Sequence, residues 1–432
     1  MKISHLFLYA VLLILSACKS DVAVTKVYLN YSIFTLTVGA TLELEAIIMP
    51  ENATNKNVYW ISDNSAVATV SNGTVAGLTS GNAVVTVTTQ DGNKTAECSV
   101  TVKEKEVVEK PKPKPEMLRD GPFPVGAALN PASLRTDVQY CELVLKELTG
   151  ITPENAMKMP NLTNGARGVY DWTDADYFAD FAQSNGIRLH GHCLVWYKDG
   201  TRTDAKMKWF VNFSGSKEEW KQMMREYILA VVGRYKGKVV AWDVVNEALM
   251  DDGSFRGDGD IWCKNIGAPD YIDWAFLCAH EADPDALLFY NDYGHEYSAT
   301  KRTAINNLIK GMIARGVPIH GIGLQFHTNT DRNTADLKTA ILTAAQTGLK
   351  VHVSELTVDV NASKDANAEL EKQYESYKMV SATMSSLPKE QQYGITTWGL
   401  RDPVSPPPGP LMFDNNYQRK RAYAGVVDGF PR

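Results

Sequence analysis

The chain has 432 residues, of which 44% are hydrophobic and 22% are charged, and its formal net charge is −6. The composition is that of a soluble globular protein, and the length accommodates two or three domains, or one large barrel with an appendage. The acidic balance makes nucleic acids and anionic membrane surfaces poor partners, so neither is expected to bind.

The first residues are typical of a targeting segment rather than of folded structure. A basic residue precedes an apolar run over residues 6–15, which is too short to span a bilayer. The run is followed by Ser16-Ala17-Cys18, and the whole resembles the lipobox of bacterial lipoproteins. The resemblance implies a signal peptide over residues 1–17, lipidation of Cys18 and a tether over residues 18–24.

Export is therefore expected, with the mature protein held by lipid at a bacterial membrane. The charged residues Lys19-Ser20-Asp21 favour the outer membrane, either on its periplasmic side or at the cell surface. The alternative is a plain secretory signal with an incidental cysteine.

The other cysteines give no indication of a metal site. They are odd in number once Cys18 is set aside, and they show neither a CxxC motif nor the spacing of Cys/His ligands. We therefore expect buried free thiols, with a bridge between Cys263 and Cys278 as the alternative. The remaining three are Cys98, Cys141 and Cys193.

Residues 25–102 alternate polar and apolar side chains with a period of two, as half-buried strands do. Turn-forming clusters separate these segments, and short strands at regular spacing predict a β-sandwich. The clearest strand-like segments are 34–38, 42–46 and 84–88, with turns at 52–55, 71–73 and 90–93.

This all-β region also carries a set of motifs in a characteristic order. They are Leu36-Thr37-Val38-Gly39, Pro50-Glu51-Asn52-Ala53-Thr54, Val58-Tyr59-Trp60, Val67-Ala68-Thr69-Val70 and Gly73-Thr74-Val75-Ala76-Gly77. Together they resemble the bacterial immunoglobulin-like group 2 domain. The resemblance implies a spacer or presenting module, and adhesion to carbohydrate or to a surface is the alternative role.

Residues 103–116 are rich in lysine, glutamate and proline, and Pro alternates with Lys over residues 110–115. Such a segment cannot pack into a core and favours extended polyproline geometry. We expect a semi-rigid stalk that separates the N-terminal domain from a second domain over residues 117–432.

In the second domain, apolar β-branched segments alternate with amphipathic helical windows. Eight such strands, with a helix between each strand and the next, predict a (β/α)8 TIM barrel of the α/β class. A doubly wound open sheet is the alternative, but neither a GxGxxG motif nor a P-loop follows the first strand. The expected strands are 125–129, 147–152, 188–196, 239–246, 287–293, 319–327, 351–356 and 393–400, and the expected helices are 135–146, 174–185, 217–235, 271–282, 299–315, 334–347 and 366–386.

The ends of these strands carry polar and aromatic residues that a barrel core does not need. The carboxyl ends of the strands meet on one rim, where barrels bind their ligands. Rings together with amides and carboxylates suit a neutral polyhydroxylated substrate, which offers both stacking faces and hydroxyl groups. The fifth expected strand, for example, ends on Asn291-Asp292-Tyr293. The residues expected to act at this rim are Glu154, Asn155, Lys158, His192, Trp196, Asn246, Glu247, Tyr293, Gln325, His327, Glu355 and Trp398.

This set of residues implies no cofactor and no metal ion. The acidic residues that follow Glu247 lack the spacing of a calcium loop. They are expected in a solvated, mobile insert, at Asp251, Asp252, Asp258 and Asp260.

Two apolar strands end on a glutamate, the first on Glu247 and the other on Glu355. In a closed barrel both tips can face one substrate. Cleavage of a glycosidic bond requires a protonated acid at the leaving oxygen and a carboxylate at the anomeric carbon. A separation of about 5 Å would retain the anomeric configuration through a covalent intermediate, whereas a wider one would admit a water molecule and invert it.

The motifs around these glutamates follow the order of a known family. They are Thr152-Pro153-Glu154-Asn155…Lys158, Gly191-His192…Leu194-Val195-Trp196, Trp242-Asp243-Val244-Val245-Asn246-Glu247, Gln325…His327, Ser354-Glu355-Leu356 and Trp398-Gly399. Across essentially the whole barrel they resemble glycoside hydrolase family 10, the retaining endo-β-1,4-xylanases.

The resemblance implies cleavage of internal linkages in xylan or xylo-oligosaccharides, with Glu247 as general acid/base and Glu355 as nucleophile. It further implies that Asn246 binds the 2-hydroxyl of the sugar beside the cleaved bond, and that Gln325 or His327 orients Glu355. The subsite of the scissile sugar would comprise His192, Trp196, Gln325, His327 and Trp398, and the next sugar on the non-reducing side would contact Glu154, Asn155 and Lys158.

Several positions depart from the pattern of this family. Tyr197 stands where the family has His, Met159 where it has Trp, and Thr357 where it has Asp. After the Trp398 motif the family has Ser-Trp, whereas this chain has a proline-rich segment over residues 405–410. We predict a more open cleft that favours decorated xylans or short oligosaccharides over plain xylan.

Two other functions stay open on the sequence alone. A retaining barrel glycosidase that acts on glucan or mannan would use the same two glutamates, and its products from a panel of polysaccharides would distinguish it. A glycan-binding barrel without catalysis would bind its ligand equally well after Glu247→Gln. A monomer is expected in each case.

Overall fold

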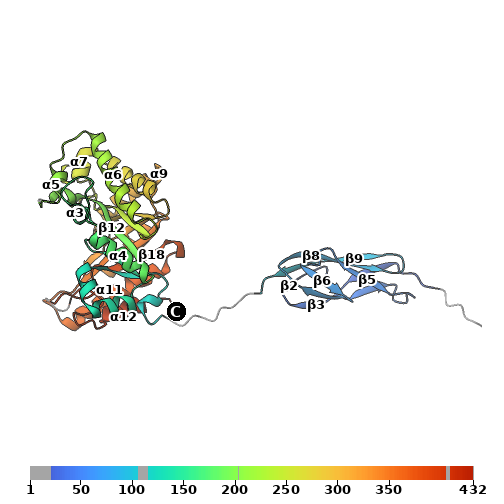
Figure 1. Cartoon of the computed structure of the whole chain (residues 1–432). Helices are drawn as coiled ribbons and strands as arrows, with labels where there is room; N and C mark the ends of the chain where they lie inside the picture. Colours follow the sequence, from blue (N-terminus) through green and yellow to red (C-terminus); the bar gives the residue numbers. More distant parts are fainter. Residues whose placement is uncertain (1–20, 106–114, 203, 405–408, 432) are drawn as a thin grey trace, which may run out of the picture. The chain divides into compact units, whose positions relative to one another are not determined.

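The computed structural model describes residues 21–105, 115–202, 204–404 and 409–431, and the chain forms two compact units, residues 1–110 and 111–432 (Figure 1). The predicted signal peptide with Cys18, most of the predicted stalk and the prolines at 406–408 lie outside the described residues. Among the described residues, no helix is long and apolar enough to cross a membrane.

The N-terminal unit is all-β, as predicted. Strands β2, β9, β8 and β5 form one sheet in that order, and β3, β7 and β6 form a second, while β1 pairs with β4. The strands are β1 (Lys26–Leu29), β2 (Ile33–Thr37), β3 (Thr41–Glu43), β4 (Ala46–Met49), β5 (Val58–Ser62), β6 (Ala68–Ser71), β7 (Thr74–Gly77), β8 (Gly81–Thr89) and β9 (Thr95–Lys103).

The period-two pattern explains the core of this unit. Along β8, the side chains of Val85 and Val87 are fully buried while their neighbours are only half-buried. They pack with Val75 of the second sheet and Val100 of β9 in one cluster, so the two sheets share a core. The expectation of a sandwich is confirmed.

The C-terminal unit is a closed parallel barrel, which confirms the predicted fold. Eight strands form the ring in the order β10–β11–β12–β13–β14–β15–β17–β18, and β18 pairs back onto β10 (Figure 1). The strands are β10 (Val125–Leu129), β11 (Gly150–Pro153), β12 (Arg188–Trp196), β13 (Ala241–Asn246), β14 (Leu287–Asp292), β15 (Gly321–Leu324), β16 (His327–Asn329), β17 (Lys350–Asp359) and β18 (Gln392–Thr397).

Helices surround this ring, and their apolar faces bury against it in one continuous core. The helices are α1 (Pro131–Thr136), α2 (Val138–Glu147), α3 (Met159–Leu162), α4 (Thr173–Ser184), α5 (Lys208–Val211), α6 (Lys217–Arg234), α7 (Ile261–Ile266), α8 (Asp270–Ala282), α9 (Ala299–Ala314), α10 (Thr334–Ala345), α11 (Ala366–Ser386) and α12 (Arg421–Asp428). Short 3₁₀ turns lie at Leu118–Asp120, Tyr197–Thr201, Gly257–Gly259 and Lys389–Gln391.

Several predicted elements have other bounds in the structure, and three of them show why. The strand expected from residue 147 begins at Gly150, because Glu147 ends α2, where its carboxylate accepts a hydrogen bond from Arg419. The helix expected from residue 135 is two helices, because Asp137 caps α2 and ends α1. The strand expected over 319–327 is interrupted at Phe326, whose φ is +57°.

The predicted free thiols are confirmed for the described part of the chain. Cys98, Cys193, Cys263 and Cys278 are buried and unpaired, so the alternative bridge between Cys263 and Cys278 is wrong, and Cys141 is free and half-buried. The prediction of a solvated acidic insert is wrong for Asp260. This side chain is 1% exposed and caps α7 by accepting the N–H of Trp262 at 2.9 Å.

Candidate active site

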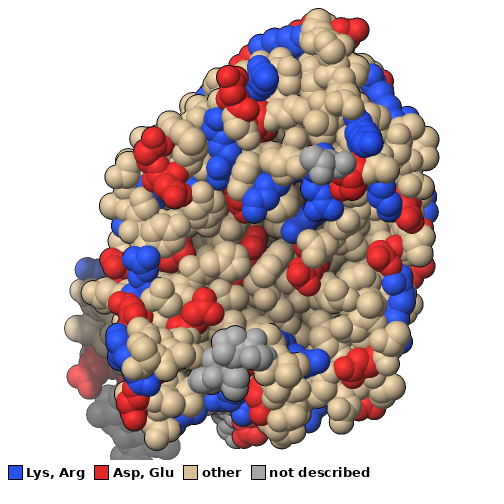
Figure 2. Space-filling model, turned by 90° about the vertical axis from the view of Figure 1, so that its left-hand side faces the viewer, with Lys and Arg blue, Asp and Glu red and all other residues tan. Residues whose placement is uncertain are grey.

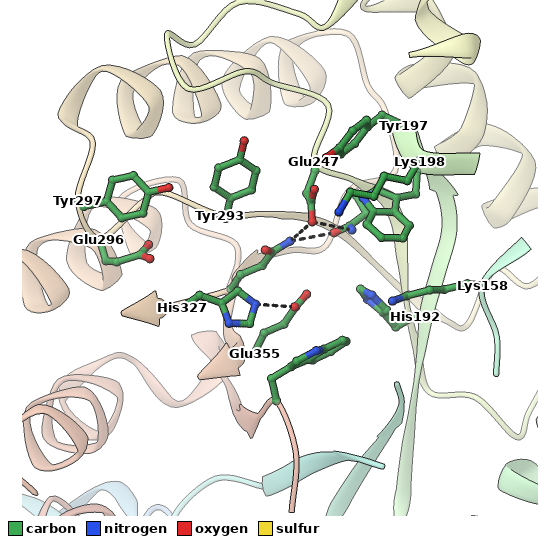
Figure 3. A pocket seen from close by; sticks show the side chains of 14 residues that line it. Lys158, His192, Tyr197, Lys198, Glu247, Tyr293, Glu296, Tyr297, His327 and Glu355 are labelled. Carbon is green, nitrogen blue, oxygen red and sulfur yellow. Dashed lines mark hydrogen bonds and ion pairs between the residues drawn. The ribbon is translucent and has the colours of Figure 1, made fainter. Parts of the chain in front are cut away.

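A cavity of about 380 Å³ opens at the carboxyl ends of the barrel strands. Figure 2 shows the hollowed face, with acidic side chains inside the hollow and basic side chains near its upper edge. All predicted rim residues except Glu154 and Asn155 line this cavity. Its complete lining is Lys158, His192, Trp196, Tyr197, Lys198, Asn246, Glu247, Tyr293, Glu296, Tyr297, Gln325, His327, Glu355 and Trp398 (Figure 3).

Glu154 and Asn155 follow β11 but do not line the cavity. Asn155 acts through its neighbour, because its Oδ1 accepts a hydrogen bond from Lys158 Nζ at 3.1 Å. The same ammonium lies 4.8 Å from the Trp196 ring and 5.4 Å from the Trp398 ring. A cation held between two indoles leaves its N–H donors and the ring faces available to a sugar.

Glu355, in the middle of β17, is 5% exposed and is held at both of its carboxylate oxygens. His327 Nε2 lies 3.0 Å from Oε2, and Asn291 Nδ2 donates to Oε1 at 2.8 Å. Burial opposes ionisation, but the contacts with His327 outweigh it and hold the pKa of Glu355 below its usual value. An ionised, oriented carboxylate is the form that a nucleophile requires.

His327 keeps a second contact in spite of the change at position 357. Its Nδ1 lies 3.1 Å from the hydroxyl of Thr357, which occupies the place of the family's aspartate. Desolvation lowers the pKa of His327, but Glu355 and the other glutamates outweigh it, so that the pKa is raised. The imidazole is therefore paired with one carboxylate, that of Glu355, and with a neutral hydroxyl.

Glu247 follows β13 directly and has a φ of +57°, in the left-handed region that side chains other than glycine rarely adopt. Gln325 Nε2 donates to its Oε1 at 3.0 Å. Of the two residues expected to orient Glu355, the structure places His327 against Glu355 and Gln325 against Glu247. The two carboxylates lie on opposite sides of the cavity (Figure 3).

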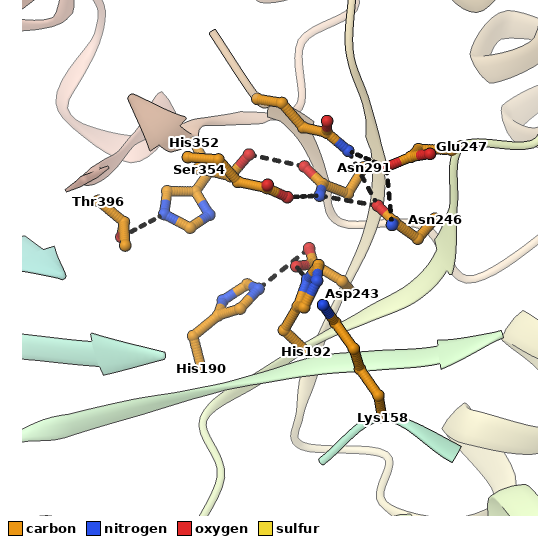
Figure 4. Close-up of polar contacts among 12 residues, drawn as sticks. Lys158, His190, His192, Asp243, Asn246, Glu247, Asn291, His352, Ser354 and Thr396 are labelled. Carbon is orange, nitrogen blue, oxygen red and sulfur yellow. Dashed lines mark hydrogen bonds and ion pairs between the residues drawn. The ribbon is translucent and has the colours of Figure 1, made fainter. Parts of the chain in front are cut away.

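Asn291, at the end of β14, connects the two glutamates and was not among the predicted site residues. Its amide nitrogen donates to Asn246 Oδ1 at 2.9 Å as well as to Glu355, and its Oδ1 accepts from Ser354 Oγ at 2.6 Å (Figure 4). A Cβ on Gly323 would lie 2.2 Å from Asn291 Oδ1, so a glycine is required there. The buried amide of Asn291 thus fixes β13, β14 and β17 relative to one another at the site.

A second buried network supports His192 from below the cavity. Asp243 lies between two imidazoles, 2.8 Å from His192 Nδ1 and 3.0 Å from His190 Nε2 (Figure 4). Burial alone would raise the pKa of Asp243, but the two imidazoles outweigh it, and the pKa lies well below its usual range. The contact fixes the ring of His192, whose edge meets the ring of Trp398 at 5.1 Å.

Four lining residues were not among the predicted site residues: Tyr197, Lys198, Glu296 and Tyr297. Glu296 is 1% exposed, and neither carboxyl oxygen has a hydrogen-bond partner on another residue in the described part of the chain. Burial raises the pKa of this carboxyl to about 7. These residues lie in loops beyond the strand tips, where no periodic pattern marks them.

We expect Glu296→Gln to stabilise the protein at alkaline pH and to have little effect at acid pH. The folded-state pKa of about 7 lies above the usual 4.5, so wild type loses stability as pH rises between these values. The difference approaches about 3 kcal/mol above neutrality. Denaturant unfolding at about pH 4 and about pH 8 measures it, and parallel profiles for the two proteins would contradict it.

The comparisons with known proteins agree with this geometry. Residues 116–429 match the model of glycosyl hydrolase family 10. The chain belongs to this family. Residues 23–100 match the bacterial Ig-like domain (group 2), which confirms the second resemblance.

Curated relatives and solved structures of the family cover the barrel. Endo-1,4-β-xylanase A of Thermoanaerobacterium saccharolyticum is 34% identical over 71% of this chain, and the match spans only 27% of that longer protein. β-1,4-Xylanase of Dictyoglomus thermophilum is 36% identical over 71% of this chain and 88% of its own length. The crystal structure of xylanase 10B from Thermotoga petrophila in complex with xylobiose superposes with a TM-score of 0.66 at 31% identity, covering 74% of this chain and 98% of that one.

Within the described residues, no group of three or more His, Cys, Asp or Glu side chains could hold a metal ion.

Proposed function

We propose that the barrel unit is a retaining endo-β-1,4-xylanase in which Glu247 is the general acid/base and Glu355 the nucleophile. The observation that carries the proposal is the pair of glutamates, Glu247 directly after β13 and Glu355 in β17, that face one cavity. Asn291 joins them, because its side chain donates to Glu355 and its backbone carbonyl accepts the N–H of Glu247. Relatives over the same residues are named as xylanases, and one structural neighbour holds xylobiose.

In the first step, Glu355 attacks the anomeric carbon while Glu247 protonates the oxygen of the departing sugar. The new bond joins the Glu355 carboxylate to the sugar, and the bond to the leaving oxygen breaks. His327 and Asn291 keep Glu355 ionised and aimed before attack. In the second step, Glu247 takes a proton from water, which displaces Glu355 and restores the original configuration.

The donor and acceptor sugars would lie on different sides of the two glutamates. Lys158 and His192 lie on one side of the cavity, and Tyr293 and Tyr297 lie on the other (Figure 3). The ring of Trp398 contacts both Lys158 and His192. By the family resemblance, the first side binds the sugar chain that is attached to Glu355. Tyr293 and its neighbours would then face the departing chain.

Digestion of xylan, glucan and mannan by the full chain, with products sized by chromatography, tests the proposal. Xylo-oligosaccharides should appear from xylan alone. Release of gluco- or manno-oligosaccharides at a higher rate than xylo-oligosaccharides would favour a glycosidase that acts on glucan or mannan. Absence of cleavage with retained binding would favour a glycan-binding barrel.

We also propose that the departures from the family pattern favour decorated or short substrates. Tyr197 lines the cavity, while residues 405–408 lie outside the described part of the chain. Turnover of linear xylohexaose should be lower than that of arabinoxylan at equal concentration of xylose units. Equal or higher turnover of the linear substrate contradicts this preference.

The export and lipid anchor stay a proposal that rests on the lipobox at Cys18. Metabolic labelling with a palmitate analogue should mark wild type but not Cys18→Ser, and only wild type should sediment with outer membranes. Labelling of both proteins, or of neither, would contradict the anchor.

A further inference from the structure

The backbone carbonyl of Glu247 accepts a hydrogen bond from Arg256, which has no role in the two steps above. The left-handed backbone at Glu247 is fixed on one side by its own N–H, which donates to Asn291 O at 2.8 Å. On the other side its carbonyl oxygen accepts a hydrogen bond from Arg256 Nε at 2.6 Å. Both peptide groups that flank this unfavourable φ are therefore held in place.

The segment after β13 folds back so that Arg256 reaches Glu247. Leu249 and Phe255 form an antiparallel bridge, and Met250 N donates to Ser254 O at 2.8 Å. The turn between them is closed by Asp252, whose Oδ1 accepts the N–H of Ser254 at 2.9 Å. A short hairpin-like loop thus presents the guanidinium nine positions after the glutamate that it contacts.

The remaining contacts of Arg256 are with two tyrosines of the cavity wall. Its Nη2 donates to Tyr293 Oη at 3.2 Å, and its guanidinium carbon lies 3.7 Å from the centroid of the Tyr197 ring. A guanidinium combines planar stacking with several fixed N–H donors, so one side chain can hold a carbonyl, a hydroxyl and a ring together. Arg256 is half-buried, which strengthens these contacts over those of an exposed arginine.

From these contacts we infer that Arg256 is a positioning residue that aligns the acid/base Glu247 with the oxygen of the departing sugar and couples that alignment to Tyr197 and Tyr293. The inference rests on the proposed function. A sugar that packs on the two tyrosines fixes their rings, the rings fix the guanidinium, and the guanidinium fixes the carbonyl of Glu247. A general acid must lie within hydrogen-bond reach of the oxygen that it protonates, and displacements of about 1 Å cost about 10²-fold in rate.

Two substrates separate positioning of the acid from a general structural role. Xylohexaose has a sugar alkoxide as its leaving group and needs the proton from Glu247. Dinitrophenyl β-xylobioside releases an acidic phenol, which departs without protonation. Loss of acid alignment therefore lowers kcat/KM for xylohexaose but not for the aryl substrate, whereas damage to the barrel or to Glu355 lowers both.

The test compares wild type with Arg256→Met, which keeps the length of the side chain but removes its donors, and with Arg256→Lys. We expect Arg256→Met to lower kcat/KM for xylohexaose by about 10- to 100-fold and to leave kcat/KM for dinitrophenyl xylobioside nearly unchanged. Its kcat for the aryl substrate should fall, because the second step uses Glu247 as base. Arg256→Lys, which retains one donor, should recover part of the loss.

The coupling to the cavity wall is tested by a double-mutant cycle with Tyr197→Leu. If the ring acts through Arg256, the double variant loses less kcat/KM on xylohexaose than the product of the two single losses. Equal losses on both substrates, no loss on xylohexaose, or purely multiplicative effects overturn the inference and leave the proposed function intact. A wild type that cleaves neither substrate overturns the proposed function, and the inference with it.

Discussion

Glu355→Ala should abolish hydrolysis of every xylan substrate, by about 10⁴-fold or more in kcat. The change removes the only carboxylate positioned at the anomeric carbon in the proposed mechanism, so the covalent intermediate cannot form. It also removes the carboxylate that His327 and Asn291 contact, so these two residues have no nucleophile left to orient. Initial rates on dinitrophenyl xylobioside measure the loss, because this substrate needs no general acid in the first step.

A matched control separates loss of the nucleophile from loss of the fold. Glu390 is an exposed glutamate in the 3₁₀ turn before the amino end of β18, whereas the site lies at the carboxyl ends of the strands, and Glu390→Ala should retain full activity. Thermal unfolding should show that Glu355→Ala is folded. Residual activity above about 1% of wild type in a folded Glu355→Ala protein would remove Glu355 from the nucleophile role.

The sequence indicated the strand tips well, because their chemistry contrasts with the apolar runs that precede them. Residues 239–245 are apolar except for Asp243, the polar pair Asn246 and Glu247 follows them, and the structure places both members of the pair at the cavity. The eightfold alternation of strands and helices predicted the barrel for the same reason. Such contrasts are local, so one sequence suffices to find them.

The residues that were missed depend on contacts between distant segments. Asn291 was visible in the Asn291-Asp292-Tyr293 strand end, but its role requires the glycine at 323 and the serine at 354 to lie beside it. Arg256 lies in a loop whose acidic neighbours dominate its composition. Glu296 follows the end of β14 by four residues, and its carboxyl oxygens accept no hydrogen bond from another residue in the described part of the chain. The pairing of strands in space, rather than pattern along the chain, brings these groups to the site.

Position 247 shows how the two kinds of information combine. The sequence identified the carboxylic acid, but only the backbone geometry shows that it occupies a left-handed conformation held by Asn291 and Arg256. The strain at this residue is maintained by its surroundings, as is common at functional sites. The effect of removing the Glu247 side chain therefore depends on whether the leaving group of the substrate needs a proton.

Glu247→Ala should lower kcat/KM only for substrates whose leaving group needs a proton. On xylohexaose, kcat/KM should fall by about 10²- to 10⁴-fold, which is the usual contribution of a general acid. On dinitrophenyl xylobioside, kcat/KM should stay close to wild type, because the phenol departs unaided and Glu355 still attacks. The kcat on this substrate should nevertheless fall, because no base activates the water that releases the sugar from Glu355. Steady-state kinetics on the two substrates measure both effects.

External azide provides the decisive control for this assignment. Azide is already a nucleophile and needs no base, so it should restore kcat of Glu247→Ala on dinitrophenyl xylobioside by attacking the sugar–Glu355 intermediate. The product should be the β-xylobiosyl azide, since two inversions at one carbon return the original configuration. For Glu247→Ala, an α-azide would mean a single displacement and would assign Glu355 a different role. For Glu355→Ala, azide can occupy the space of the missing carboxylate and displace the phenol once, so the azide product of this variant should be the α-anomer. The opposite stereochemistry of the two azide products thus tests both glutamates, without knowledge of the natural polysaccharide.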